Sequence, residues 1–85
     1  MSPPPIQTPG LRGVWKLVGK ARTTGSLLRP TSWEHDAEGE FEGRKMFATI
    51  ALSEHELRAG LGNPMRLVDS FNAAMIAADK DAFGS

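Results

Sequence analysis

The sequence contains no cysteine and no tyrosine, and its only histidines are His35 and His55. Without cysteine, neither a disulfide nor a thiolate-bound zinc ion can stabilise the fold. A cysteine nucleophile is excluded for the same reason. The two histidines also lie outside the H-E-x-x-H spacing of zinc-dependent proteases. We therefore predict no metal site and no bound cofactor.

Long apolar runs are missing as well. No segment approaches the length of about 18 apolar residues that a membrane-spanning helix requires. The first residues, Met1 to Pro5, include neither the basic start nor the apolar stretch of a signal peptide. The sequence therefore predicts a cytoplasmic protein with no membrane partner.

Motifs of the common enzyme classes are absent too. There is no G-x-S-x-G around a serine nucleophile, and no glycine-rich loop with the spacing of a nucleotide site. Paired carboxylates occur, but a glycosidase also needs a cleft, which a chain of 85 residues rarely builds. We predict a protein that is not an enzyme.

The charges are balanced overall but unevenly distributed. Residues 1–33 carry five basic side chains and no acid, whereas residues 34–45 carry five acids and two bases. This asymmetry is typical of a basic binding surface, but it also fits a fold in which basic and acidic strands lie side by side. Both interpretations stay open at this point.

The first half of the chain reads as three strands. Residues 1–10 hold four prolines and are expected to form an extended arm outside the domain. Leu11–Arg22 alternates in the manner of a strand, Leu27–His35 forms a second one, and Glu40–Leu52 a third. Turns are predicted over residues 23–26 and 36–39.

Two of these strands carry a further prediction about their position. Pro30 cannot donate to a ladder, so the second strand is expected at an edge of the sheet or with a bulge. The apolar stretch Met46–Leu52 predicts that the third strand is covered on both faces or lies at the sheet centre.

The second half of the chain reads as two helices. Ser53 and Glu56 have the spacing of a capping box, which predicts a short helix that ends before Gly60 and Gly62. Asn63 is expected to cap a second helix, which begins at Pro64 and continues to about Ala82. Its expected core face comprises Val68, Phe71, Met75, Ala78 and Ala82, widened by Leu67 and Ala74.

Together these elements predict an α+β fold. We expect a three-stranded antiparallel meander followed by a short and a long helix, both packed on one face of the sheet. Residues 11–85 would form a single small domain. A domain of this size buries only roughly 60% of the surface of its unfolded chain, so a partner or a second copy would help to stabilise it.

The acidic run Glu34–Glu42 has an acid at every second position. Its first six residues imitate the start of a calcium-binding loop, but the last ligand position of such a loop would be Lys45. The alternation instead predicts two strands joined at residues 36–39, with Asp36 near Glu40 and Glu34 near Glu42. Facing acids repel each other, so this tip would be solvated, internally paired or bound by a basic partner.

A second apolar stripe on the long helix is the other candidate contact surface. Since a helix turns about 100° per residue, Met65, Ile76 and Phe83 lie apart from the main core face. We predict a non-enzymatic protein-interaction, regulatory or inhibitor module, which binds another protein or a second copy of itself. The predicted contact residues are Met65, Ile76 and Phe83 on the helix and Glu34, Asp36, Glu40 and Glu42 at the acidic tip.

Nucleic-acid binding is the alternative prediction. Basic strands with aromatic residues hold single-stranded nucleic acid in several small sheet proteins. The residues for this role would be Arg12, Lys16, Lys20 and Arg22. The position of Trp15 argues against nucleic-acid binding, because its side chain lies on the strand face opposite these basic residues.

Overall fold

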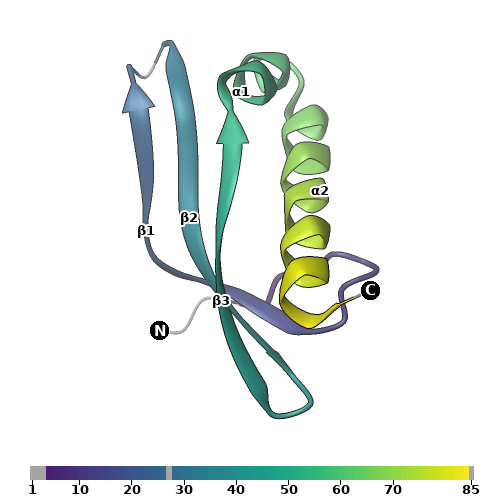
Figure 1. The fold of residues 1–85 in the computed structure, drawn as a ribbon. Coiled ribbons are helices and arrows are strands. Elements are labelled where there is room, and N and C mark those ends of the chain that lie inside the picture. Colours follow the sequence, from purple (N-terminus) through teal and green to yellow (C-terminus); the bar gives the residue numbers. More distant parts are fainter. Residues whose placement is uncertain (1–3, 27, 85) are drawn as a thin grey trace.

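The computed structural model describes residues 4–26 and 28–84, and it confirms the predicted α+β arrangement (Figure 1). Three antiparallel strands in the order β1-β2-β3 are followed by two helices. The elements are β1 (Val14–Gly25), β2 (Pro30–Phe41), β3 (Arg44–Ser53), α1 (Glu54–Gly60) and α2 (Pro64–Phe83).

The hairpin between β2 and β3 turns at Glu42 and Gly43, so the predicted turn over residues 36–39 is wrong. Phe41 pairs with Arg44, and the ladder continues without a shift to Ser32 opposite Ser53. Glu42 and Gly43 have φ angles of 50° and 78°. Positive φ at both central residues is the geometry of a type I′ turn, which matches the twist of the strands.

Gly39 does not form a turn but makes room for the packing of another side chain. It lies in the middle of β2, opposite Trp15 of β1. A Cβ atom at this position would lie 2.5 Å from the indole of Trp15. The side chain of Trp15 can therefore lie flat on the sheet only because residue 39 is glycine.

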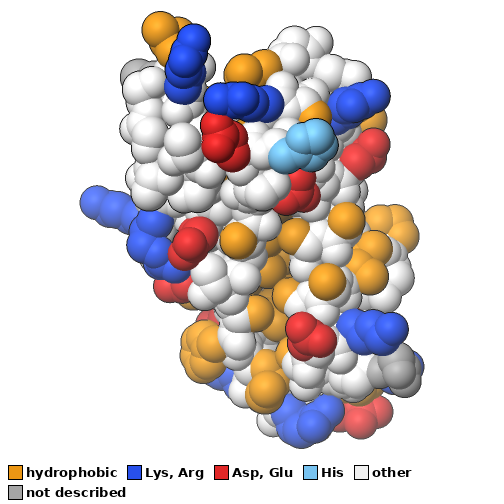
Figure 2. Space-filling view, turned by 45° about the horizontal axis from the view of Figure 1, so that its top comes forward, with side chains coloured by type: hydrophobic (Ala, Val, Ile, Leu, Met, Phe, Trp, Pro, Cys, Tyr) orange, Lys and Arg blue, Asp and Glu red, His pale blue; other side chains and the backbone are white. Residues whose placement is uncertain are grey.

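The strand order is that of the predicted meander, so β2 is the central strand and β3 is an edge strand. The expected central position of the third strand is therefore wrong. Of the two alternatives for the second strand, the edge position is wrong, but a bulge beside Pro30 is confirmed, because the pairing with β1 shifts between Thr24 and Gly25. Pro30 is tolerated because it is the first residue of β2, where it interrupts no inner ladder bond. Only one face of β3 is covered, since α2 packs on one side and Phe47 on the other side is 69% exposed. Figure 2 shows hydrophobic side chains gathered over the middle and lower part of one face of the molecule, with charged side chains above and below them.

The first strand begins and ends three residues later than predicted. Its pairing with β2 shifts between Val18 and Arg22, where three residues of β1 lie opposite His35 alone. Gly19 has a φ of 76° in this bulge, and its carbonyl lies 3.2 Å from Nε2 of His35. Bulges of this kind bend a strand and interrupt its outer edge.

Both helices begin at the residues that the sequence predicts. Ser53 accepts a hydrogen bond from the Glu56 amide and Glu56 accepts one from the Ser53 amide, which completes the capping box. In α2, Pro64 occupies the first turn, but the Asn63 side chain makes no capping bond. No helix in the described ranges is both long enough and apolar enough to cross a membrane.

The core lies between the sheet and α2. Its buried side chains are Trp15, Ala37, Ile50, Met75 and Phe83. Phe83 is only 6% exposed and contacts the rings of Trp15 and Phe41, with centroids 5.6 Å apart in each pair. Phe83 therefore belongs to the core and not to an exposed stripe, contrary to the prediction.

The described part of the proline-rich arm lies against the domain. The Ile6 amide donates to the Trp15 carbonyl at 2.7 Å, and the Thr8 hydroxyl donates to Asn72 of α2 at 3.0 Å. Ile6 also packs on the core cluster. These contacts place the arm beside the start of β1 at Ile6 and against α2 at Thr8.

Candidate functional site

The acidic residues lie in a row along one strand, not at a hairpin tip. Glu34, Asp36, Glu38 and Glu40 occupy alternate positions of β2, on the face opposite α2. The predicted facing pairs of acids are therefore wrong, and Glu42 lies apart in the turn. Because β2 is the central strand, both neighbouring strands can supply bases to this row.

Arg22 of β1 neutralises one half of the row. Its guanidinium donates to Asp36 at 3.0 Å and to Glu34 at 3.4 Å, and Thr49 of β3 donates to Asp36 at 2.9 Å. Hydrogen bonds, first from Arg22 and then from Thr49, hold the pKa of Asp36 below its ordinary value. Adjacent basic and acidic strands thus explain the uneven charge distribution.

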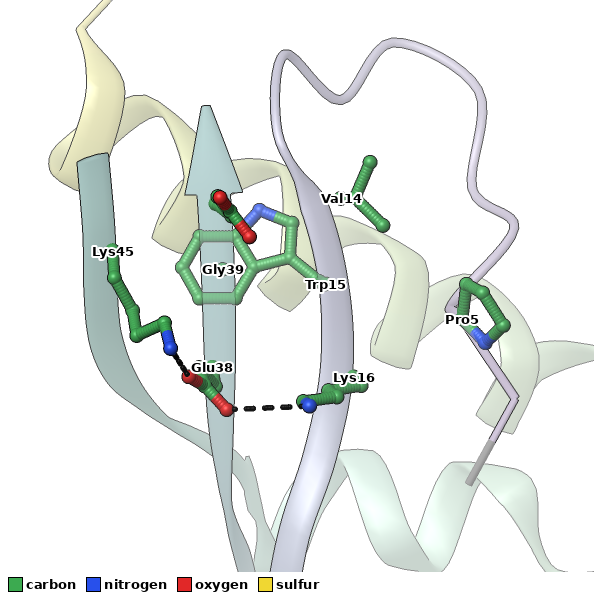
Figure 3. A pocket seen from close by; sticks show the side chains of 8 residues that line it. Pro5, Val14, Trp15, Lys16, Glu38, Gly39 and Lys45 are labelled. Atoms are coloured by element: carbon green, nitrogen blue, oxygen red, sulfur yellow. Dashed lines mark ion pairs between the residues drawn. The ribbon is translucent and has the colours of Figure 1, made fainter. Parts of the chain in front are cut away.

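Glu38 forms the second ion-pair group, between two lysines (Figure 3). Lys45 of β3 lies 3.1 Å from one carboxylate oxygen, and Lys16 of β1 lies 3.6 Å from the other. The hydrogen bond from Lys45 is the main cause that lowers the pKa of Glu38. A pocket of about 190 Å³ lies beside this group, and Lys16, Glu38 and Lys45 of its lining are already paired with one another.

The predicted nucleic-acid residues are divided by these pairs. Lys16 and Arg22 are bound to acids of β2, and Lys20 lies in the bulge of β1. Arg12 precedes β1, and its backbone amide is held by α2. The four bases thus form no continuous basic stripe among the described residues, and nucleic-acid binding stays an untested prediction.

The described residues include no group of three histidine, aspartate or glutamate side chains placed to hold a metal ion. The segment Glu34–Gly39 that resembles a calcium loop is an extended strand. Alternate residues of a strand lie on one face but about 7 Å apart, so these carboxylates are spread along β2 and do not surround one point.

Asp79 is a polar residue that the sequence patterns did not single out. It lies on α2, is 3% exposed, and accepts hydrogen bonds from the amides of Arg12 and Gly13 at 2.9 Å. The indole N–H of Trp15 donates to the same carboxylate at 2.8 Å. The sequence signal for this residue was an acidic side chain on the apolar face of a predicted helix. Its three bonds fasten the start of β1 to α2, which is a structural role.

The predicted stripe on α2 is not a single surface. Met65 is 66% exposed and Ile76 45% exposed, whereas Phe83 is buried. Met65 lies in the first turn of α2, three turns away from Ile76 along the helix. Another apolar depression, of about 340 Å³, lies between α1 and α2 and is lined by Trp33, Leu52, Leu57, Leu67, Val68 and Phe71.

A groove between β3 and α2 is a further feature that the sequence patterns missed. It has a volume of about 540 Å³ and touches every residue of β3 from Met46 to Ala51. Because consecutive strand residues point to opposite faces, a groove that touches all of them runs along the strand edge. Its far wall is the helix face formed by Ala74, Ala77, Ala78, Asp81 and Ala82.

The two edges of the sheet differ sharply. The edge of β1 is interrupted by the bulge, occupied at Trp15 by the arm, and flanked by Lys16 and Lys20. Bulges, loops and lysines are the devices that protect sheet edges from unwanted pairing. From Met46 to Leu52, β3 has none of them: its register is continuous and its side chains are uncharged.

The outer backbone groups of β3 also lack partners within the described part of the chain. None of the backbone hydrogen bonds outside the helices and the sheet ladder there involves residues 44–52. An edge of this length and composition pairs readily with another strand.

Comparisons with family models, curated proteins and solved structures gave no match to this chain.

Proposed function

We propose that this protein is a non-enzymatic protein-interaction module that binds an extended segment by adding it as a fourth strand beside β3. The observation that supports the proposal most directly is the unprotected edge from Met46 to Leu52, which opens into the groove beside α2. Strand addition supplies affinity through main-chain hydrogen bonds and specificity through alternate side chains.

The composition of the groove fits such a ligand. One face of an added strand would lie against the alanines of α2, whose short side chains leave room for larger ones. The other face would continue the open side of the sheet, next to Phe47. The bound segment should therefore be apolar on the face that contacts α2.

A display library of random peptides tests strand addition without knowledge of the natural partner. The domain is immobilised sparsely, so that copies of it do not meet, and is used to select peptides of about 12 residues, the length of a long strand. We expect selected peptides with apolar residues at alternate positions.

Two matched variants locate the peptide. Phe47→Lys/Ala51→Lys adds two charges to the β3 edge, and each lysine lies opposite a glutamate of β2, which preserves folding. Val14→Lys/Val18→Lys adds the same charges to the β1 edge, also opposite acids. The first variant should weaken peptide binding at least about tenfold and the second should not. Failure to select any peptide, or equal binding to both variants, contradicts the proposal.

A further inference from the structure

We infer that the strand bound by β3 is β3 of a second copy of the chain, in an antiparallel pair whose twofold axis passes near Thr49. This inference rests on the proposed strand addition and names its partner. The uncharged, mostly apolar stretch Met46–Leu52 is centred on Thr49 and forms the free edge of the sheet. The same stretch also has the uncharged composition that we expect of a strand bound at this edge.

The charges at the two ends of β3 are complementary in this arrangement. Arg44 and Lys45 begin the strand, whereas Glu54 follows its last residue. An antiparallel pair centred on Thr49 brings Arg44 of one copy opposite Glu54 of the other. Basic and acidic ends then meet twice, because the interface of a twofold dimer repeats every contact.

The side chains also match across the proposed pair. Residues that lie directly opposite each other must point to the same face of the sheet. With Thr49 at the axis, Phe47 lies opposite Ala51 of the second copy on the open face, and Met46 lies opposite Leu52 on the face of α2. The exposed ring of Phe47 thereby gains a neighbour with a small side chain, which leaves room for it.

The two long helices meet on one side of the resulting six-stranded sheet. Within one copy, α2 packs chiefly on β3, so the axis at the β3 edge brings α2 of each copy close to the other. The helix wall that faces the axis is formed mainly by alanine, including Ala74, Ala77 and Ala78. Helices pack about 8–10 Å apart, with the shortest distances where contact residues are small.

The absence of cysteine makes the proposed register directly testable. Opposite residues of an antiparallel pair have Cα atoms about 4.5–5.5 Å apart, within the range that a disulfide bridges. Thr49→Cys should therefore form a disulfide-linked dimer under mild oxidation. Phe47→Cys and Ala51→Cys should each crosslink poorly alone but efficiently when mixed, and Val14→Cys on β1 should not crosslink.

The oligomeric state gives an independent measurement. Sedimentation of the wild-type chain should show about 18 kDa, twice the 9.2 kDa of one chain, with dissociation on dilution. Phe47→Lys/Ala51→Lys should weaken the dimer at least about tenfold, and Val14→Lys/Val18→Lys should leave it unchanged. Circular dichroism verifies that both variants are folded.

Three outcomes would overturn the inference. A wild-type chain that stays monomeric at every concentration excludes the second copy, while peptide selection still decides on strand addition. A dimer that Phe47→Lys/Ala51→Lys leaves intact, or that Ile76→Asp disrupts instead, places the interface elsewhere. Crosslinking of Val14→Cys as fast as that of Thr49→Cys shows that the contacts are random.

Discussion

Asp79 is the residue on which the junction between β1 and α2 depends. Asp79→Asn keeps the size of the side chain but replaces one acceptor oxygen by a donor. At least one of the N–H groups of Arg12, Gly13 and Trp15 then faces a donor without compensation. We expect a loss of about 2–3 kcal/mol in the free energy of unfolding, measured by urea denaturation.

Asp81 provides the control on the same helix, because its side chain is exposed. Asp81→Asn should change the free energy of unfolding by less than about 0.5 kcal/mol. Equal effects of the two substitutions would show that the carboxylate of Asp79 has no special role.

The same carboxylate predicts how stability depends on pH. Burial raises the pKa of Asp79, but the hydrogen bonds from Arg12, Gly13 and Trp15 outweigh burial and leave the pKa below its ordinary value. A carboxyl whose pKa is lower in the folded state stabilises the fold above its unfolded pKa of about 3.9, and this contribution is lost as the pH falls through the folded pKa.

Urea denaturation at pH values from about 7 down to 2 measures this contribution. The difference in stability between wild type and Asp79→Asn should be largest near neutral pH and should shrink in acid. Asp36 and Glu38 also have lowered pKa values, and their contributions remain in the variant. A difference that does not vary with pH would contradict the assignment.

Gly39 is the second residue whose replacement should change the free energy of unfolding. Gly39→Ala adds one methyl group against the indole of Trp15, where β2 leaves no space. Overpacking of this kind costs typically about 1–3 kcal/mol, despite the lower entropy of the unfolded chain with alanine. Gly43→Ala is unsuitable as a control because of its positive φ, so Ala51→Gly, at an exposed position of β3, measures the general effect of glycine in a strand.

Among the elements, β2 carries charges that its neighbours neutralise. Arg22→Gln removes the group that contributes most to the lowered pKa of Asp36. We expect the pKa of Asp36, followed by carboxyl carbon NMR shifts, to move up towards its ordinary value. Lys20→Gln removes a nearby charge outside the ion pairs and should leave the pKa of Asp36 unchanged. A similar shift of this pKa in both variants would indicate only a general charge effect.

The sequence predicted the helices better than the hairpin. Capping residues act locally, so Ser53, Glu56 and Pro64 mark helix starts without knowledge of the fold. The turn was misplaced because Asp36–Gly39 has favourable turn residues, whereas Glu42–Gly43 lacks the preferred Asn-Gly or Asp-Gly pair. What decides between them is the contact of Gly39 with Trp15, which lies on another strand.

The candidate interface illustrates the same limit of local patterns. An apolar run such as Met46–Leu52 looks alike in a central strand and in an edge strand with an open groove. Strand order separates the two cases. A three-stranded meander places its third strand at an edge, so the apolar run alone was misleading about the position of β3. The acidic row was recognised in the sequence, but its neutralisation by Arg22, Lys16 and Lys45 requires the pairing of all three strands.

At the scale of the whole molecule, the N-terminal arm closes one side of the domain. Removal of residues 1–8 takes away the bond of Ile6 to Trp15, the bond of Thr8 to Asn72 and the apolar contact of Ile6. We expect a loss of about 2–4 kcal/mol in the free energy of unfolding, from the contact and two hydrogen bonds together.

The truncated chain should also associate through a second edge. With the arm removed, the start of β1 is free to pair, so light scattering should detect species larger than those of the full chain. Gln7→Ala, at an exposed position of the arm, serves as the control. Unchanged stability of the truncated chain would mean that the arm does not contribute to the fold.

The burial of Trp15 beside Asp79 also gives the molecule two distinct optical reporters. Without tyrosine, ultraviolet fluorescence of the chain arises almost entirely from Trp15 and Trp33. Trp15 reports on the attachment of β1 to α2, while Trp33 lines the apolar depression near α1 and its ring lies 6.2 Å from that of Phe71. Replacing each tryptophan by phenylalanine in turn would therefore separate the two emissions. The unfolding rate near Trp15 and the rate near Trp33 could then be compared by the same fluorescence measurement on the two variants.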